Sequence, residues 1–206
     1  MKQLSLLLII AIILISCSEE EKKDQSTIKL NINWQFSEAG KNDWKPATVP
    51  GTIHTDLLDN GMIEDPFYRL NEKDQQWIDK TDWEYKTTFQ VDDELLQKNH
   101  IEMVFHGMDT YADVFLNDQK ILTADNMFRT WKADVKPYLK PGENTLRVLL
   151  KSPINIGLEK LDEHGYQLPA DNDQSENGGL GDKKVSIFTR KAGYHFGWDW
   201  GPRLVT

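Results

Sequence analysis

Hydrophobic and polar residues alternate along several short stretches of this 206-residue chain. The clearest stretch runs from Trp83 to Val91, where aromatic and β-branched residues occupy every second position. Because successive side chains of a β-strand point to opposite faces, this period of two predicts a strand with one buried face. Similar short patterns predict strands at residues 30–36, 44–49, 82–91, 101–105, 111–116, 120–124 and 145–150.

Turn-forming residues separate the predicted strands. Pro50-Gly51 and Pro141-Gly142 interrupt the chain, and Asn117-Asp118 predicts a hairpin between residues 111–116 and 120–124. Short strands joined by regular turns are typical of β-sandwiches and jelly rolls. We therefore predict an all-β fold in a single domain.

Few segments favour helix. Residues 55–60 predict a helix of one or two turns, and residues 154–166 place apolar side chains at helical spacing among charged ones. Residues 171–184 are polar and rich in glycine, which predicts a loop. The pattern at residues 185–189 fits either a helix or an edge strand.

The N-terminus resembles a targeting signal. An apolar run at residues 4–15 is shorter than a bilayer-spanning helix and ends just before the single cysteine, Cys17. The sequence Leu14-Ile15-Ser16-Cys17 resembles the bacterial lipoprotein box, which predicts a signal peptide at residues 1–16 and a lipid on Cys17. An ordinary signal peptide followed by an incidental thiol is the alternative.

The residues after Cys17 form a predicted tether. Residues 18–26 are polar or charged and contain no apolar side chain, so they lack the material for a packed core. We predict a lipidated tether over residues 17–27 and a folded domain over residues 28–206. The lipid would then be the only membrane contact, in the bacterial cell envelope, on the periplasmic or the surface face of the outer membrane.

Composition excludes several classes of function. A net charge of −9 and a pI near 5.0 argue against a nucleic-acid partner, because no basic stripe is present to neutralise phosphates. One cysteine allows no disulfide framework, and the five histidines stand at no metal-ligand spacing. We expect no metal and no organic cofactor.

The segment 190–202 carries the most informative side chains, because it places aromatic residues and an acid between glycines. A sugar ring presents an apolar face and a rim of hydroxyls, so a flat aromatic ring beside a carboxylate suits its recognition. Trp198 and Asp199 form such a pair. The alternative is a buried corner in which Trp198 and Trp200 fill the core and Asp199 caps a turn.

Two other candidates are less specific. Asn71-Glu72 matches the general acid/base pair of many barrel glycosidases, but it lies in a polar stretch without a flanking strand. We interpret it as a surface coincidence. His54 and His195 have no partner serine or cysteine, so we interpret both as structural histidines.

Six segments together resemble the N-terminal domain of β-mannosidases in glycoside hydrolase family 2. They occur in the expected order and span nearly all of residues 30–206: Val49–Leu58, Asp65–Arg69, Trp83–Tyr85, Gly107–Val114, Asn126–Arg129 and Gly197–Arg203. The resemblance implies a jelly-roll β-sandwich of the galactose-binding-like type, followed by immunoglobulin-like sandwiches that flank a (β/α)₈ barrel. Trp-Asp-Trp-Gly-Pro favours mannosidases over the galactosidases and glucuronidases of the family.

The resemblance also implies a function. Such enzymes remove terminal β-D-mannose from the non-reducing end of glycans or oligosaccharides with retention, using two glutamates of the barrel. Asp199 would contact the mannose, Trp198 would line its pocket, and Trp200 would pack inward.

No catalytic residue is expected in this chain itself. Its jelly roll is expected to be incomplete at the C-terminus, with an open sheet edge, and the missing barrel of the same polypeptide is its expected partner. Two alternatives remain: a stand-alone surface lipoprotein that binds carbohydrate without catalysis, and a structural sandwich without a ligand.

Overall fold

A computed structural model describes residues 26–199 and 201–206. The predicted signal peptide at residues 1–16, the lipid attachment at Cys17, most of the predicted tether and Trp200 lie outside the described residues. Within the described ranges, no helix is long and apolar enough to cross a membrane.

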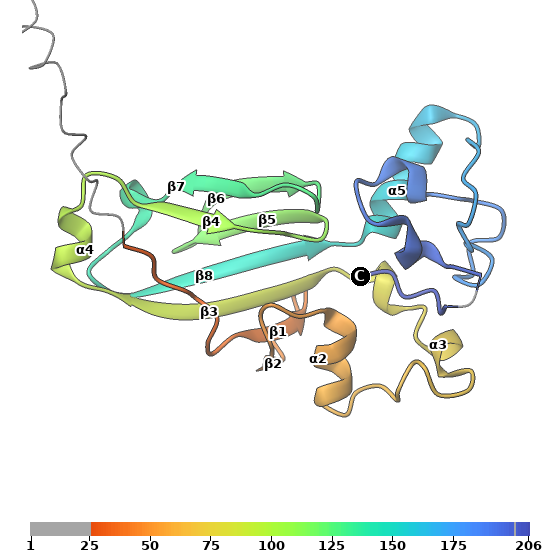
Figure 1. The fold of residues 1–206 in the computed structure, drawn as a ribbon, viewed down its shortest axis with the longest axis horizontal. Helices are drawn as coiled ribbons and strands as arrows, with labels where there is room; N and C mark the ends of the chain where they lie inside the picture. The colour runs from red at the N-terminus through yellow and green to blue at the C-terminus, as the bar shows by residue number, and fades with distance from the viewer. Residues whose placement is uncertain (1–25, 200) are drawn as a thin grey trace, which may run out of the picture.

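Two antiparallel sheets form the body of the molecule. The larger sheet has six strands in the order β2-β1-β3-β8-β5-β6, and the smaller one pairs β4 with β7 (Figure 1). The strands are β1 (Gln35–Glu38), β2 (Lys45–Pro46), β3 (Trp83–Val91), β4 (Glu102–Phe105), β5 (Tyr111–Leu116), β6 (Gln119–Asp125), β7 (Trp131–Asp134) and β8 (Gly142–Lys151). This arrangement confirms the predicted all-β fold.

One hydrophobic cluster joins the two sheets. Trp83 of β3 is buried against Phe36 of β1, with their ring centroids 6.1 Å apart. Val114 of β5 is fully buried in the same cluster, and Phe105 of β4 and Trp131 of β7 pack against it. The smaller sheet is thus held by side-chain packing, since its backbone pairs only with itself.

Short helices lie at the ends and edges of the sheets. They are α2 (Ile53–Asp59), α3 (Asn71–Asp74), α4 (Asp93–Gln97) and α5 (Pro153–His164), with 3-10 turns η1 (Ile78–Lys80), η2 (Lys136–Tyr138), η3 (Ser186–Phe188) and η4 (Gly193–Phe196). Thr52 and Thr55 form a capping box at the start of α2. Ser152 caps the start of α5, and Gly165 ends it in a left-handed conformation. Both predicted helices are therefore confirmed.

The strand predictions differ in outcome. The structure confirms the strand at 82–91 and the hairpin, where Asn117 and Asp118 both take the positive φ that a tight hairpin turn needs. The predicted strand at 30–36 is wrong, because Asn33 has φ 57°, which breaks the extended conformation, and β1 begins at Gln35. The segment 185–189 contains η3 and forms neither a full helix nor a strand.

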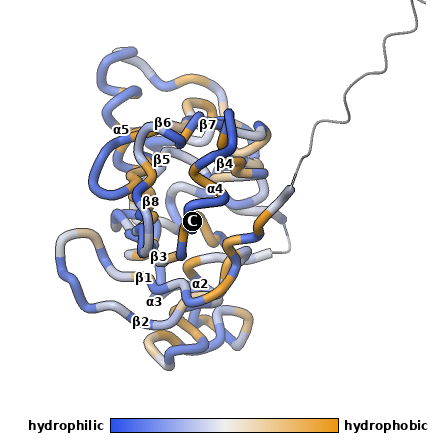
Figure 2. The backbone as a smooth tube through the Cα atoms, turned by 90° about the vertical axis from the view of Figure 1, so that its left-hand side faces the viewer, coloured by the Kyte–Doolittle hydropathy of each residue, from blue (hydrophilic) through white to orange (hydrophobic). Residues whose placement is uncertain are grey.

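The chain after β8 forms a separate lobe. In Figure 1, α5 and the following residues gather at one end of the sandwich, and α4 lies at the opposite end. Figure 2 places α2, α3 and β2 on the side of the molecule opposite β6 and β7. The lobe has a small core of its own, made of Ile154, Leu161, Val185, Phe196 and Val205.

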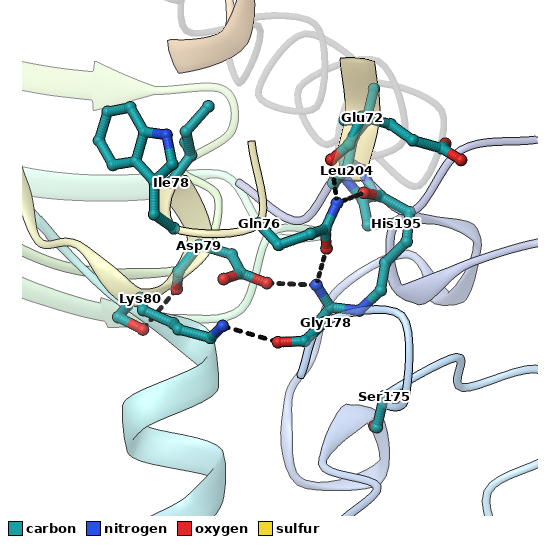
Figure 3. A network of polar contacts seen from close by, with 12 residues as sticks. Glu72, Gln76, Ile78, Asp79, Lys80, Ser175, Gly178, His195 and Leu204 are labelled. Carbon is teal, nitrogen blue, oxygen red and sulfur yellow. Dashed lines mark hydrogen bonds and ion pairs between the residues drawn. The ribbon is translucent and has the colours of Figure 1, made fainter. Parts of the chain in front are cut away.

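A buried ion pair joins this lobe to η1. The Arg203 guanidinium contacts the Asp79 carboxylate, and it donates a second hydrogen bond of 2.7 Å to Gln76 Oε1. Gln76 Nε2 donates in return to the Arg203 carbonyl at 2.8 Å. In Figure 3 the side chains of Gln76 and Asp79 converge on this guanidinium group. Gly178 lies directly against this cation, since a Cβ there would stand 2.5 Å from Arg203 Cζ.

The pair depends on mutual compensation of charge. Arg203 is 2% exposed, and its Nε and Nη2 have no hydrogen-bond partner in the described part of the chain. Burial raises the pKa of Asp79, and the positive charge of Arg203 opposes that shift. Removal of either charge would therefore leave the other buried and uncompensated.

Replacing Arg203 by Met should lower the free energy of unfolding by about 3–5 kcal/mol, because Asp79 would stay buried without its counter-charge. Urea unfolding followed by circular dichroism measures this loss. Arg129→Met is the matched control, since Arg129 is exposed and stacks on Trp131, and it should cost less than about 1 kcal/mol. Adding Asp79→Asn to Arg203→Met should recover part of the loss. If Arg203→Met and Arg129→Met lowered the free energy of unfolding equally, the prediction would be wrong.

Candidate functional site

The predicted contact residues lie on a tight turn of the C-terminal lobe. Trp198 and Gly201 form an isolated antiparallel bridge, and the Gly201 amide donates to the Trp198 carbonyl at 3.4 Å. Asp199 is exposed, and Trp198 is 40% exposed. Trp200, which was expected to pack inward, lies outside the described residues. The turn therefore presents an aromatic ring and a carboxylate at the surface.

Gln174 supports the turn from below. Its backbone amide donates to the Phe196 carbonyl and its side-chain amide donates to the Trp198 carbonyl, both at 2.9 Å. Gly197 lies between these two carbonyls with φ 124°, and a Cβ there would come within 2.6 Å of the Gln174 side chain. Only glycine combines this backbone conformation with so close an approach. The position of the turn is thus fixed against the loop that carries Gln174.

A buried lysine ties the two sides of the turn together. Lys191, which precedes the turn, pairs with the Asp109 carboxylate and donates a hydrogen bond of 2.9 Å to Thr206 Oγ1, beyond the turn. Thr206 Oγ1 lies 3.2 Å from Asp109 Oδ2. Burial lowers the pKa of Lys191, and the charge of Asp109 opposes that shift. Asp109, from the connection between β4 and β5, thus contacts the residues on both sides of the turn, Lys191 before it and Thr206 after it.

Two histidines adjoin this pair. His195 Nδ1 lies 3.3 Å from the Leu204 carbonyl, and its Nε2 lies 3.9 Å from Asp109 Oδ2. His54 of α2 is buried, and its Nδ1 has no hydrogen-bond partner within the described residues. Burial, with smaller contributions from His195 and Lys191, lowers the pKa of His54 to about 4. His195 thus lies beside the Lys191–Asp109 pair, and His54 is near enough for the charge of Lys191 to lower its pKa.

The exposed groups of the turn suit hydrogen bonding and stacking with a ligand. The turn offers one exposed carboxylate as a hydrogen-bond acceptor, whereas the nearby cations are buried and already paired. In the described part of the chain, no group of three or more histidine, cysteine, aspartate or glutamate residues could hold a metal ion. Asn71-Glu72 begins helix α3, which has no buried residue.

The residues that position the turn are not evident from the sequence pattern. Asp109 and Arg203 do fall within segments that carry the family resemblance, which was a usable signal. Gln174 stands in the glycine-rich stretch 171–184, whose pattern indicates only a loop. Lys191 lies in the segment 190–202, but only the aromatic and acidic residues of that segment indicated a function. Their role depends on contacts between distant parts of the chain, and periodicity carries no information on these.

Acidification should destabilise the fold through His54. The pKa of His54 is about 4 in the folded chain, and its ordinary value of 6.5 applies to the unfolded chain. As the pH falls, the unfolded chain therefore binds a proton at His54 before the folded chain does. Stability should decline by about 3 kcal/mol between about pH 7 and about pH 4 from this group alone. Urea unfolding at a series of pH values should show a shallower decline for His54→Gln. His100→Gln, at an exposed site, should keep the wild-type slope, and equal slopes in all three chains would refute the assignment.

Comparisons with known proteins agree with this fold. Residues 34–206 match the family described as glycosyl hydrolase 2 galactose-binding domain-like. Two curated relatives are a β-mannosidase from Capra hircus, 32% identical over 202 residues, and β-mannosidase B from Thermothelomyces thermophilus, 36% identical over 183 residues. These alignments cover 98% and 87% of this chain, but only 22% and 20% of those proteins. The chain spans about a fifth of the length of these relatives.

Solved structures give the same result. The crystal structure of β-D-mannosidase from Dictyoglomus thermophilum superposes with a TM-score of 0.80 and 41% identity, covering 88% of this chain and 21% of that one. An exo-chitosanase from Amycolatopsis orientalis, at 22% identity and a TM-score of 0.52 over 57% of this chain, shares the fold. The family match extends from Trp34 in front of β1 to the last residue, Thr206. The chain therefore belongs to the galactose-binding-like domain family of glycoside hydrolase family 2.

Proposed function

We propose that this chain is the N-terminal carbohydrate-binding domain of an exo-acting, retaining β-mannosidase. It would supply part of the mannose subsite to a catalytic (β/α)₈ barrel outside these 206 residues. The observation that carries the proposal is the exposed Trp198–Asp199 turn on an anchored base. The β-mannosidases among the relatives support it as well. A stand-alone carbohydrate-binding lipoprotein is not favoured, because these relatives are glycosidases of which the alignments cover only 22% and 20%.

The chemistry of the turn fits one sugar residue. Asp199, as a carboxylate, accepts hydrogen bonds from two neighbouring hydroxyls, and the Trp198 ring covers the apolar face of the pyranose. The barrel would supply two glutamates, one as nucleophile and one first as acid and then as base. The domain would contribute binding energy at the terminal mannose, with no proton transfer of its own.

The role of Asp199 is tested by kinetics in the enzyme that carries this domain. Asp199→Ala should lower kcat/KM for nitrophenyl β-mannoside by about 2–4 kcal/mol of transition-state stabilisation, because the hydroxyls it accepts would lose a charged partner. The matched control is Asp182→Ala, which removes another exposed carboxylate of the lobe and should leave the kinetics unchanged. Near-normal kcat/KM in Asp199→Ala would refute the sugar contact.

In the same assay the 206-residue chain alone should release no nitrophenol. Turnover by that chain would contradict the proposal that both catalytic glutamates lie in a barrel outside these 206 residues.

We also propose that Cys17 carries a lipid that holds the protein in the bacterial cell envelope. Support comes from the apolar run at residues 4–15 and the small residue Ser16 in front of the cysteine. In a bacterial host, radiolabelled fatty acid should be incorporated into the wild-type chain and not into Cys17→Ala. A Ser18→Ala control should label normally, and label retained in the Cys17 variant would disprove lipidation at this site.

A further inference from the structure

An open cavity of about 600 Å³ lies beside the C-terminal lobe and is separate from the Trp198–Asp199 turn. One wall comes from α3 and η1, and the other from the loop at residues 177–179. Its lining combines one aromatic ring with polar and charged groups: Lys73, Asp74, Gln76, Trp77, Lys80, Thr81, Asn177, Gly178 and Gly179. Its volume lies within the range of about 300–1,000 Å³ that is usual for small-ligand sites.

Trp77 is the aromatic surface of this cavity. It is 41% exposed, although a tryptophan of a small domain can usually bury most of its ring. Its ring also contacts buried Trp83, with the two ring centroids 5.9 Å apart. Trp83 is fixed in turn by a hydrogen bond of 3.1 Å to the Ile78 carbonyl. Trp77 therefore contributes an aromatic side chain to one wall of the cavity.

The opposite wall is formed by backbone and polar side chains. Lys80 Nζ donates to the Gly178 carbonyl at 2.6 Å, as a dashed line in Figure 3 marks, and both residues line the cavity. Gly179, with φ 73°, adds no side chain to fill the space. Asn177 and Asp74 contribute an amide and a carboxylate to the lining. The lining contains both hydrogen-bond donors and acceptors, and both positive and negative side chains. Such a mixture suits a neutral polyol better than an anion.

The cavity shares a support with the turn. Gln174 Oε1 accepts a hydrogen bond of 3.0 Å from the Asn177 side chain, and Gln174 Nε2 donates to the Trp198 carbonyl. A single side chain thus links the polar wall of the cavity to the base of the turn. A glycan whose terminal residue met Asp199 could extend toward this wall.

From these contacts we infer that the Trp77 cavity is a second carbohydrate subsite, which binds a hexose unit of the same glycan beyond the terminal mannose. The sugar ring stacks on Trp77, and its hydroxyls bond to Asn177 and Asp74. This inference rests on the proposed function of the Trp198–Asp199 turn. It adds a preference for oligosaccharides over monosaccharides, which the turn alone does not give.

Isothermal titration of the full chain with methyl β-mannoside and with a β-linked mannotriose tests the inference. The wild-type chain should bind the trisaccharide about tenfold more tightly than the monosaccharide. Trp77→Ala should abolish this ratio, and Trp77→Phe should restore most of it. Asn177→Ala, at an exposed position that does not threaten folding, should reduce the ratio as well. Tyr138→Ala is the control, because Tyr138 of η2 is 39% exposed and does not line the cavity.

The outcomes separate the two hypotheses. A wild-type chain that binds both sugars equally, or neither, overturns the second subsite, as does an unchanged ratio in both Trp77→Ala and Asn177→Ala. Asp199→Asn should weaken both sugars by the same factor and leave the ratio intact. If Asp199→Asn binds both sugars like the wild type while Trp77→Ala loses the ratio, the turn hypothesis fails and the cavity still binds sugar.

Discussion

The buried ion pair between Arg203 and Asp79 is the contact on which the placement of the C-terminal lobe depends. The lobe has its own small core around Phe196 and Val205, and an isolated bridge joins its Arg190 to Asn126, which follows β6. Apolar packing alone leaves such a lobe free to slide, because it is non-directional. A guanidinium that bonds Asp79 and Gln76 together allows one orientation only. The position of the Trp198–Asp199 turn follows from that orientation.

Two buried cations serve this one turn, which indicates a role in specificity more than in stability. Replacing a buried pair by apolar residues is often neutral for stability, since desolvation offsets the attraction of the charges. Lys191 and Arg203 flank the turn on either side, and each is matched to a carboxylate from a different part of the sandwich. A shift of the lobe would separate both Lys191 and Arg203 from their carboxylates and leave these charges buried without partners. The free-energy cost of burying these unpaired charges, rather than the attraction within the two pairs, then restricts the position of the turn that carries Asp199.

The fold was largely predictable from sequence, and the supports of the site were not. β3, β5 and the hairpin at Asn117 are encoded locally, by a period of two and by residues that tolerate positive φ. β7 escaped prediction because Trp131 is its only large apolar residue, whereas β4, which has the same length, carries Met103, Val104 and Phe105. β1 was misplaced by the left-handed conformation of Asn33. Arg203 and Asp79 stand 124 residues apart, and no local pattern links residues that distant. Trp198 and Asp199 were named because a flat aromatic ring beside a carboxylate suits a sugar, and the family resemblance then implied their contact with mannose.

A carbohydrate site needs this kind of rigidity for a thermodynamic reason. Sugars compete with water for every hydrogen bond, so each contact contributes little net free energy, and the entropy lost in ordering a loose loop would cancel it. Gln174 meets this requirement by bonding to the Trp198 carbonyl and to Asn177 at the same time. Gly197 allows that approach, since any side chain there would displace Gln174. Because Gln174 contacts both the turn and Asn177 of the cavity wall, a displacement of Gln174 would affect both features at once. This coupling is what the proposed binding of two sugar units of one glycan requires.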